Sequence, residues 1–138
     1  QDLANTTREK PLLKFSHPIY DNCLPQIDTF LINKYTKEEM KMINETRKIL
    51  GHTNLPITAT AVRVPVSNCH GESINVEFEK PCSVEKATEI LKSSPGIVVQ
   101  DDIQNSIYPL ASTSTGHDEV FVGRIRKDNY AYDLCINN

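Results

Sequence analysis

The chain has 138 residues with 15 basic and 18 acidic side chains, so its formal net charge is −3 at pH 7. A hydrophobic fraction of 38% and a charged fraction of 24% are typical of a globular domain that buries a core. The mild negative charge argues against nucleic-acid or anionic-membrane binding, and no apolar run is long enough to span a bilayer.

The first part of the chain predicts a lead-in followed by a helix. Residues 1–16 are polar at their start, and we expect a lead-in segment that is flexible there, with one domain over residues 17–138. Residues 25–33 are apolar but of no clear type. Thr36 and Glu39 have the spacing of a capping box, and Gly51 is a typical stop signal, so a helix is predicted over residues 37–50. Its apolar stripe carries Met40, Ile43, Arg47 and Leu50.

Two strands are predicted next. Residues 57–66 are rich in β-branched side chains and alternate between two faces, one of which carries Ile57, Ala59, Ala61 and Arg63. Residues 73–79 form the second strand, in which Ile74, Val76 and Phe78 are expected to face inward.

The remaining elements predict a mixed architecture. A helix is expected over residues 84–92 with Ser83 as its cap, then a short buried strand at 97–99, a long loop at 101–118, and strands at 119–126 and 130–136. The expected fold class is α+β (α/β), with a mixed, largely antiparallel sheet and helices packed on one face. Because the chain begins at Gln1 and ends on a predicted strand, we expect a fragment of a larger protein.

Four cysteines and two N-x-T sequons, at Asn5 and Asn44, leave a secreted disulfide-bonded domain as one hypothesis. Cys23, Cys69, Cys82 and Cys135 are however sparse, and the second sequon falls within a predicted helix. No C-x-x-C spacing supports a zinc site, so no metal is expected. Scattered thiols in a reducing compartment are the favoured interpretation.

Four residues could carry chemistry. Arg63 shares an inward-looking face, where a guanidinium needs an anionic partner, either a structural carboxylate or a substrate. Glu45 and Lys48 could be only an exposed pair on the first helix. His70 lies in a loop just past the strand end, where a titratable base can reach a cleft. Cys69 and His70 do not suit a nucleophile–base pair, because adjacent residues of an extended segment point to opposite sides. The scattered glycines form no nucleotide-binding loop.

Several segments together carry a family pattern. The run YTKEEMKMINETRK at residues 35–48 is similar to a helix of aspartate-semialdehyde dehydrogenases, as are TAVRVPV at 60–66 and ESINVEFE at 72–79 with His70 between them. Residues 25–28, 95–102 and 120–128 also match. The chain therefore resembles the substrate-binding and dimerisation domain of that family, whose fold is that of the C-terminal domain of glyceraldehyde-3-phosphate-dehydrogenase-like enzymes.

The resemblance implies an activity for the parent enzyme. The family reduces L-aspartyl-4-phosphate to L-aspartate 4-semialdehyde with NADPH through a Cys thioacyl intermediate, and releases phosphate. This step leads toward lysine, methionine, threonine and diaminopimelate. The resemblance also implies a cytoplasmic homodimer, or a tetramer, that binds neither nucleic acid nor membrane. The nucleotide-binding half, with the NADP site and the nucleophile, is absent here, so the 138 residues alone are expected to be inactive.

The resemblance also implies a role for each candidate residue. His70 matches the catalytic acid/base, Arg63 the clamp for the substrate α-carboxylate, Glu45 the group that receives the substrate ammonium, and Lys48 a lysine associated with the phosphate. No cofactor-binding or metal-binding residue is expected in this chain. Departures from the family pattern are Gly71 where Ser is usual, polar residues at Asp21 and Cys23, and an atypical loop at residues 110–116.

Two further hypotheses stay open beside the secreted domain. A related acyl-phosphate or acyl-CoA reductase would use the same domain with another acid, and Glu45 discriminates because it needs a substrate ammonium. A non-catalytic dimerisation module would keep only the contact between subunits.

Overall fold

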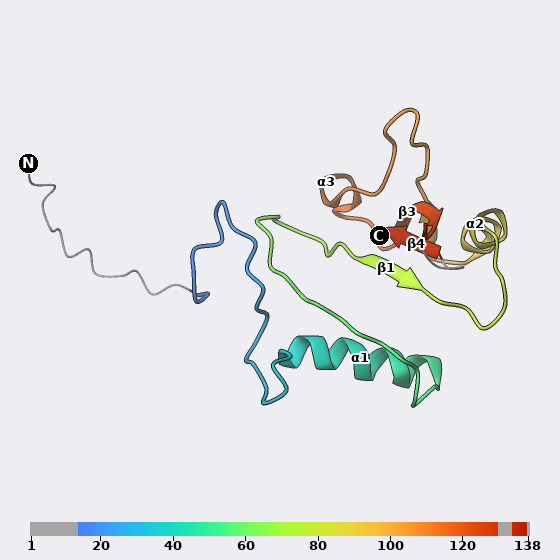
Figure 1. Cartoon of the computed structure of the whole chain (residues 1–138). Helices are drawn as coiled ribbons and strands as arrows, with labels where there is room; N and C mark the ends of the chain where they lie inside the picture. The colour runs from blue at the N-terminus through green and yellow to red at the C-terminus, as the bar shows by residue number, and fades with distance from the viewer. Residues whose placement is uncertain (1–13, 130–133, 138) are drawn as a thin grey trace, which may run out of the picture. The chain divides into compact units, whose positions relative to one another are not determined.

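The computed structural model describes residues 14–129 and 134–137, and the chain divides into two compact units, Gln1–Pro65 and Val66–Asn138 (Figure 1). Most of the predicted lead-in, and residues 130–133 of the last predicted strand, lie outside the described residues. In the described part of the chain, no helix is both long enough and apolar enough to cross a membrane.

The first unit is organised around α1, which spans Lys37–Leu50 (Figure 1). Its predicted capping box is confirmed: Glu39 N–H donates to Thr36 Oγ1 at 3.3 Å, and Thr36 N–H donates to Glu39 Oε2 at 2.7 Å. Gly51 ends the helix in the left-handed region, with φ 65°. A residue without a Cβ adopts this conformation at little cost, which explains the stop. Ile43 is buried on the predicted stripe, whereas Leu50 at its end is exposed.

The prediction of a strand at residues 57–66 is wrong. In the described chain this segment belongs to no sheet, and its single ladder contact is an antiparallel bridge between Arg63 and Leu24. The two residues exchange both backbone hydrogen bonds, at 2.8 and 2.9 Å. A β-branched run favours extended backbone, but a strand also needs a neighbour in register, which one bridge does not supply.

The extended backbone itself is nevertheless evident from burial. The predicted inner face is buried or half-buried at Ile57, Ala59, Ala61 and Arg63, while the residues between them are exposed. This period of two is the signature of an extended chain with one covered face. The predicted face of Arg63 is therefore confirmed although the strand is not.

Three side-chain contacts fasten residues 55–61 to α1 and to Tyr35, which lies two residues before the helix. Glu39 Oε1 accepts from Ala61 N–H at 2.9 Å, Arg47 Nε donates to the Leu55 carbonyl at 2.9 Å, and the Tyr35 hydroxyl lies 3.1 Å from Thr58 Oγ1. Glu39 is buried, and the backbone N–H groups of Thr36 and Ala61 lower the pKa of its carboxyl below the ordinary value of 4.5. The carboxylate is thus held in its charged form by backbone donors at a helix N-terminus.

The second unit contains a four-stranded sheet in the order β1-β4-β3-β2, with bounds Ser73–Val76, Leu134–Asn137, Val120–Lys127 and Ile97–Val99. β1 pairs antiparallel with β4 and β4 with β3, whereas β2 pairs parallel with β3. The mixed α/β class is therefore confirmed, and the parallel β2–β3 pairing qualifies the expectation of a largely antiparallel sheet.

Helix α2, Val84–Ser93, packs against β2 and β3 and begins at the predicted cap Ser83. Its buried Ala87 forms the core of this unit with Val122 and Ile125 of β3. The predicted loop at 101–118 contains a short helix, α3, Ala111–Ser114. The second predicted strand ends at Val76 rather than Glu79, and Ile74 and Phe78, expected to face inward, are exposed at 39% and 42%.

At a bulge in β3, the residues that follow β2 are held close to β3. The β3–β4 register shifts between Gly123 and Arg126, and Arg124 has a φ of 56°. The Asp101 carboxylate accepts from Arg124 N–H at 2.9 Å and Ile125 N–H at 3.0 Å, so it satisfies two donors that the bulge withdraws from the ladder. Gly123 next to the bulge lies against the backbone of Gln100 and the ring of Pro109.

Replacing Gly123 with Ala should destabilise the protein by about 3 kcal/mol, because overpacking against backbone cannot relax by a rotamer change. The new Cβ would overlap the Gln100 carbonyl oxygen and lie 2.6 Å from Pro109 Cδ. Urea unfolding measures this loss of stability. Gly116→Ala is the matched control, since its Cβ meets open space and only its φ of 88° is strained, at about 1–2 kcal/mol. A G123A loss no larger than that of G116A would contradict the close approach.

Replacing Glu39 with Gln should lower the free energy of unfolding by about 1–3 kcal/mol near pH 7, because an amide offers only one acceptor oxygen to two N–H donors. Since the folded pKa of Glu39 is lowered, the unfolded chain takes up the proton first as the pH falls. The stabilisation by Glu39 is therefore complete above pH 4.5 and is lost as the pH falls through the lowered folded pKa. Urea unfolding of the parent and E39Q from pH 7 to pH 3 should show the two stabilities converging at the acid end.

Glu38→Gln is the control for this experiment. Glu38 is the neighbouring residue, and within the described part of the chain its carboxylate forms only a surface ion pair with Lys41, at 3.8 Å. Such pairs contribute about 0.3–0.5 kcal/mol, so E38Q should stay close to the parent at every pH. A stability deficit of E39Q that is the same at pH 7 and pH 3 would show that the charge of Glu39 is not what stabilises the fold.

Candidate functional site

Arg63 is held by its backbone, while part of its side chain lacks a partner. Its guanidinium carbon lies 4.5 Å from the centroid of the Phe15 ring, a cation–π distance. Its Nε is buried and makes no hydrogen bond to any described residue. Buried donors are normally satisfied, so an orphaned Nε on a half-buried guanidinium indicates a place for an anionic ligand. Of the two partners that the sequence left open, a structural carboxylate is not found among the described residues.

Glu45 and Lys48 lie one helical turn apart on the exposed side of α1. In the part of the chain that the structure describes, they form no ion pair with each other. Both side chains are exposed, which agrees with a solvated helix surface as well as with contact to a ligand. An unengaged carboxylate and an unengaged ammonium on one helix face can instead contact a ligand that carries both signs of charge.

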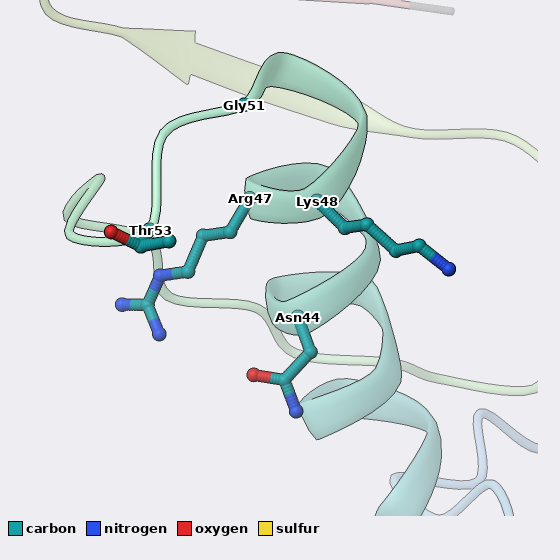
Figure 2. A pocket seen from close by; sticks show the side chains of 5 residues that line it. All are labelled: Asn44, Arg47, Lys48, Gly51 and Thr53. Atoms are coloured by element: carbon teal, nitrogen blue, oxygen red, sulfur yellow. The ribbon is translucent and has the colours of Figure 1, made fainter.

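A hollow of about 460 Å³ lies at the C-terminal end of α1, lined by Asn44, Arg47, Lys48, Gly51 and Thr53 (Figure 2). Figure 2 shows Arg47 extending toward the turn that carries Thr53, whereas Lys48 projects away from it. Arg47 Nε is engaged by the Leu55 carbonyl, so Lys48 is the freer cation. The sequence pattern placed Arg47 only on the apolar stripe of this helix, and it gave no signal for the hollow.

His70 lies in the second unit, exposed, in the loop that precedes β1. The thiol of the preceding Cys69 lies 3.6 Å from Thr115 Oγ1, and Cys69 has a φ of 67°. No hydrogen bond joins Cys69 to His70 among the described residues. The backbone is not extended at Cys69, however, so the sequence argument against a nucleophile–base pair rested on a premise that does not hold here. Glu45, Lys48 and Arg63 thus belong to the first unit and His70 to the second. Among the described residues, no hydrogen bond or ion pair joins Arg63 to Glu45 or Lys48.

The described cysteines do not form disulfides. Cys23, Cys69 and Cys82 are free thiols, and the side chain of Cys135 lies outside the described residues. Within the described ranges, no group of three or more His, Cys, Asp or Glu side chains could hold a metal ion.

The residues present do not fit a dinucleotide. The five glycines are scattered, so the chain has no Gly-rich turn in which backbone N–H groups could cradle a pyrophosphate. The donors in the hollow of α1 are at a helix C-terminus, where the helix dipole is negative.

Comparison with known proteins gives the family. The model of the semialdehyde dehydrogenase dimerisation domain matches residues 2–136. The chain is 50% identical over 135 residues to an aspartate-semialdehyde dehydrogenase of Aquifex aeolicus, covering 93% of this chain and 40% of that protein. It is 46% identical over 116 residues to that of Bacillus subtilis, covering 83% of this chain and 34% of that protein. It thus spans well under half of these relatives.

Solved structures agree with the sequence comparison. Aspartate semialdehyde dehydrogenase II from Vibrio cholerae, in a complex with ASA, has a TM-score of 0.82 and 38% identity, and the match covers 89% of this chain and 37% of that one. The enzyme from Candida albicans, solved with NADP, has a TM-score of 0.61 and 25% identity over 86% of this chain and 39% of that one. The family model over residues 2–136 and these matches lead to one conclusion: the chain belongs to the semialdehyde dehydrogenase dimerisation-domain family.

Proposed function

We propose that this chain is the substrate-binding and dimerisation part of an NADP-dependent aspartate-semialdehyde dehydrogenase, which reduces L-aspartyl-4-phosphate to L-aspartate 4-semialdehyde and releases phosphate. The observation that carries the proposal is the half-buried guanidinium of Arg63, whose buried Nε lacks a partner. A planar fork with an open donor suits a substrate carboxylate. The relative from Vibrio cholerae, solved with ASA, supports a small amino-acid-like ligand.

Each candidate residue has a distinct task in this proposal. Arg63 grips the α-carboxylate, and Glu45 receives the α-ammonium, so the two together select an amino acid. Lys48 attracts the phosphate group. His70 moves the proton between solvent and the reacting groups, since an imidazole is suited to both directions near neutral pH. These residues bind, orient and exchange protons.

The redox chemistry belongs to the remainder of the enzyme. NADP supplies hydride chemistry when it is bound, and the Candida albicans relative was solved with it. In this proposal the cofactor and the reactive cysteine come from the nucleotide-binding half, so this chain contributes recognition and one acid/base group. We expect the complete enzyme to be a homodimer or a tetramer in the cytoplasm.

A related acyl-phosphate or acyl-CoA reductase is the second candidate. It would retain the fold and His70, but its substrate would carry no ammonium for Glu45. The carboxylate of Glu45 is exposed and forms no ion pair among the described residues, so in the first proposal it is available to a substrate ammonium.

Arg63→Lys in the complete enzyme should raise KM for aspartate semialdehyde about tenfold to a hundredfold, because a lysine keeps the charge but loses the paired hydrogen bonds. His70→Gln should lower kcat by about 10² to 10⁴, the usual contribution of a general acid/base. Steady-state kinetics in the oxidative direction, with NADP and phosphate, measures both.

His117→Gln is the matched control for the histidine, since the exposed side chain of His117 contacts, among the described residues, only Glu119, at 3.9 Å, and the Phe121 ring. It should leave kcat and KM unchanged. Glu45→Gln should raise KM for the amino substrate and abolish protection by α-amino-acid analogues. An R63K enzyme with unchanged KM would refute the clamp, and an E45Q enzyme that still discriminates amino substrates would favour the related reductase.

The isolated 138-residue chain should show no NADP turnover and should sediment as a dimer. It lacks a pyrophosphate cradle, but it belongs to a dimerisation-domain family. A phosphate-dependent turnover assay and sedimentation equilibrium measure the two properties. Clear turnover would overturn the assignment of the redox chemistry to the other half, and a monomer at all concentrations would overturn the association role.

A further inference from the structure

The two oxygens of the Glu39 carboxylate have separate partners. Oε2 accepts from Thr36 N–H and closes the capping box, which is local to the start of α1. Oε1 accepts from Ala61 N–H, 22 residues further along the chain. A capping box needs only one acceptor oxygen from its glutamate. The second oxygen therefore has a task that the helix itself does not require.

That task concerns the backbone next to Arg63. In an extended segment, residues two apart direct their N–H groups to the same side. Arg63 N–H is taken by the Leu24 carbonyl at 2.8 Å, and Ala61 N–H by Glu39 Oε1 at 2.9 Å. If a strand ran beside this segment, its carbonyl groups would accept from both N–H groups. The Leu24 carbonyl fills the first of these positions, and the Glu39 carboxylate fills the second in place of the missing strand.

Arg63 depends on this backbone more than an ordinary arginine would. In the described chain its side chain makes a ring contact with Phe15 but forms no ion pair, and its Nε has no hydrogen-bond partner. Its backbone N–H and carbonyl are both held by Leu24. With no side-chain hydrogen bond to fix it, the location of the guanidinium follows from where the backbone at residues 61–63 lies. A buried charged acceptor is a stiff anchor, because releasing its donor leaves a desolvated carboxylate oxygen unsatisfied.

We propose that Glu39 is a positioning residue for Arg63: its buried carboxylate anchors the Ala61 amide and thereby sets the guanidinium at the place where a substrate carboxylate binds. The inference rests on the substrate role proposed above for Arg63. Glu39 touches no substrate, so it acts on binding only through Arg63.

The test is a double-mutant cycle in the complete enzyme, using E39Q, R63A and E39Q/R63A. E39Q should raise KM for aspartate semialdehyde about tenfold, as a small misplacement of a binding group does, with kcat changed less than about twofold. In the R63A background, E39Q should leave KM unchanged, because the group through which it acts is gone. An equal KM increase in both backgrounds would overturn the positioning role.

Two controls separate positioning from stability. T36A removes the Oγ1 acceptor of the cap but leaves the contact between Glu39 Oε1 and Ala61, so it should lower Tm and leave KM unchanged. E38Q repeats the same chemical change on the neighbouring residue and should alter neither. A T36A enzyme with the KM of E39Q would show that loss of stability alone explains the effect and would overturn the inference.

A further variant covers the case in which E39Q fails to fold. E39D keeps the charge but is one methylene shorter, so it reaches one partner and not both; it should fold better and still raise KM. An E39D enzyme with parental KM would count against the inference. The two proposals fail differently: R63A with unchanged KM refutes the clamp itself, whereas R63A with raised KM and E39Q with parental KM refutes only the role of Glu39.

Discussion

The first unit depends on one buried carboxylate that satisfies two backbone donors. Glu39 joins the start of α1 to the Ala61 amide, so a local helix signal and a contact across 22 residues share the same side chain. Burying a charge is costly unless hydrogen bonds compensate for the lost water. Here two N–H groups and the positive end of α1 provide that compensation. The intervening chain of helix, turn and extended segment is closed by this contact.

The sheet of the second unit solves a related problem by the same chemistry. The bulge in β3 withdraws the amides of Arg124 and Ile125 from the ladder, and the Asp101 carboxylate accepts both. Asp101 follows β2, which pairs with β3, so the acceptor is supplied by the adjacent strand's own continuation. In each unit, an acidic side chain takes over where backbone pairing is interrupted. The absence of a side chain at Gly123 lets Gln100 and Pro109 lie against the strand at that point.

Local signals explain why some of this was predictable from the sequence. The ends of α1 follow from Thr36, Glu39 and Gly51, and α2 begins at Ser83, because caps are chosen by residues within one turn. The alternation that puts Arg63 on the covered face is equally local. The strand at 57–66 was mispredicted because pairing depends on a distant neighbour that propensity does not reveal. The bond from Glu39 to Ala61, the bulge at Arg124 and the hollow beside Arg47 depend on tertiary placement, so the sequence pattern could not locate them.

Because of its helical period, α1 places the charged side chains that make structural contacts on one face and those available to a ligand on the other. Glu39, Ile43 and Arg47 are spaced by four residues and share one face; Ile43 is buried, and the two charged side chains are committed to Ala61 and Leu55. Glu45 and Lys48 fall on the opposite side and stay exposed. A carboxylate that is buried and doubly bonded cannot also recognise a substrate, whereas one without structural contacts can. The same helix therefore fixes the segment that carries Arg63 with one set of charges and presents another set to solvent.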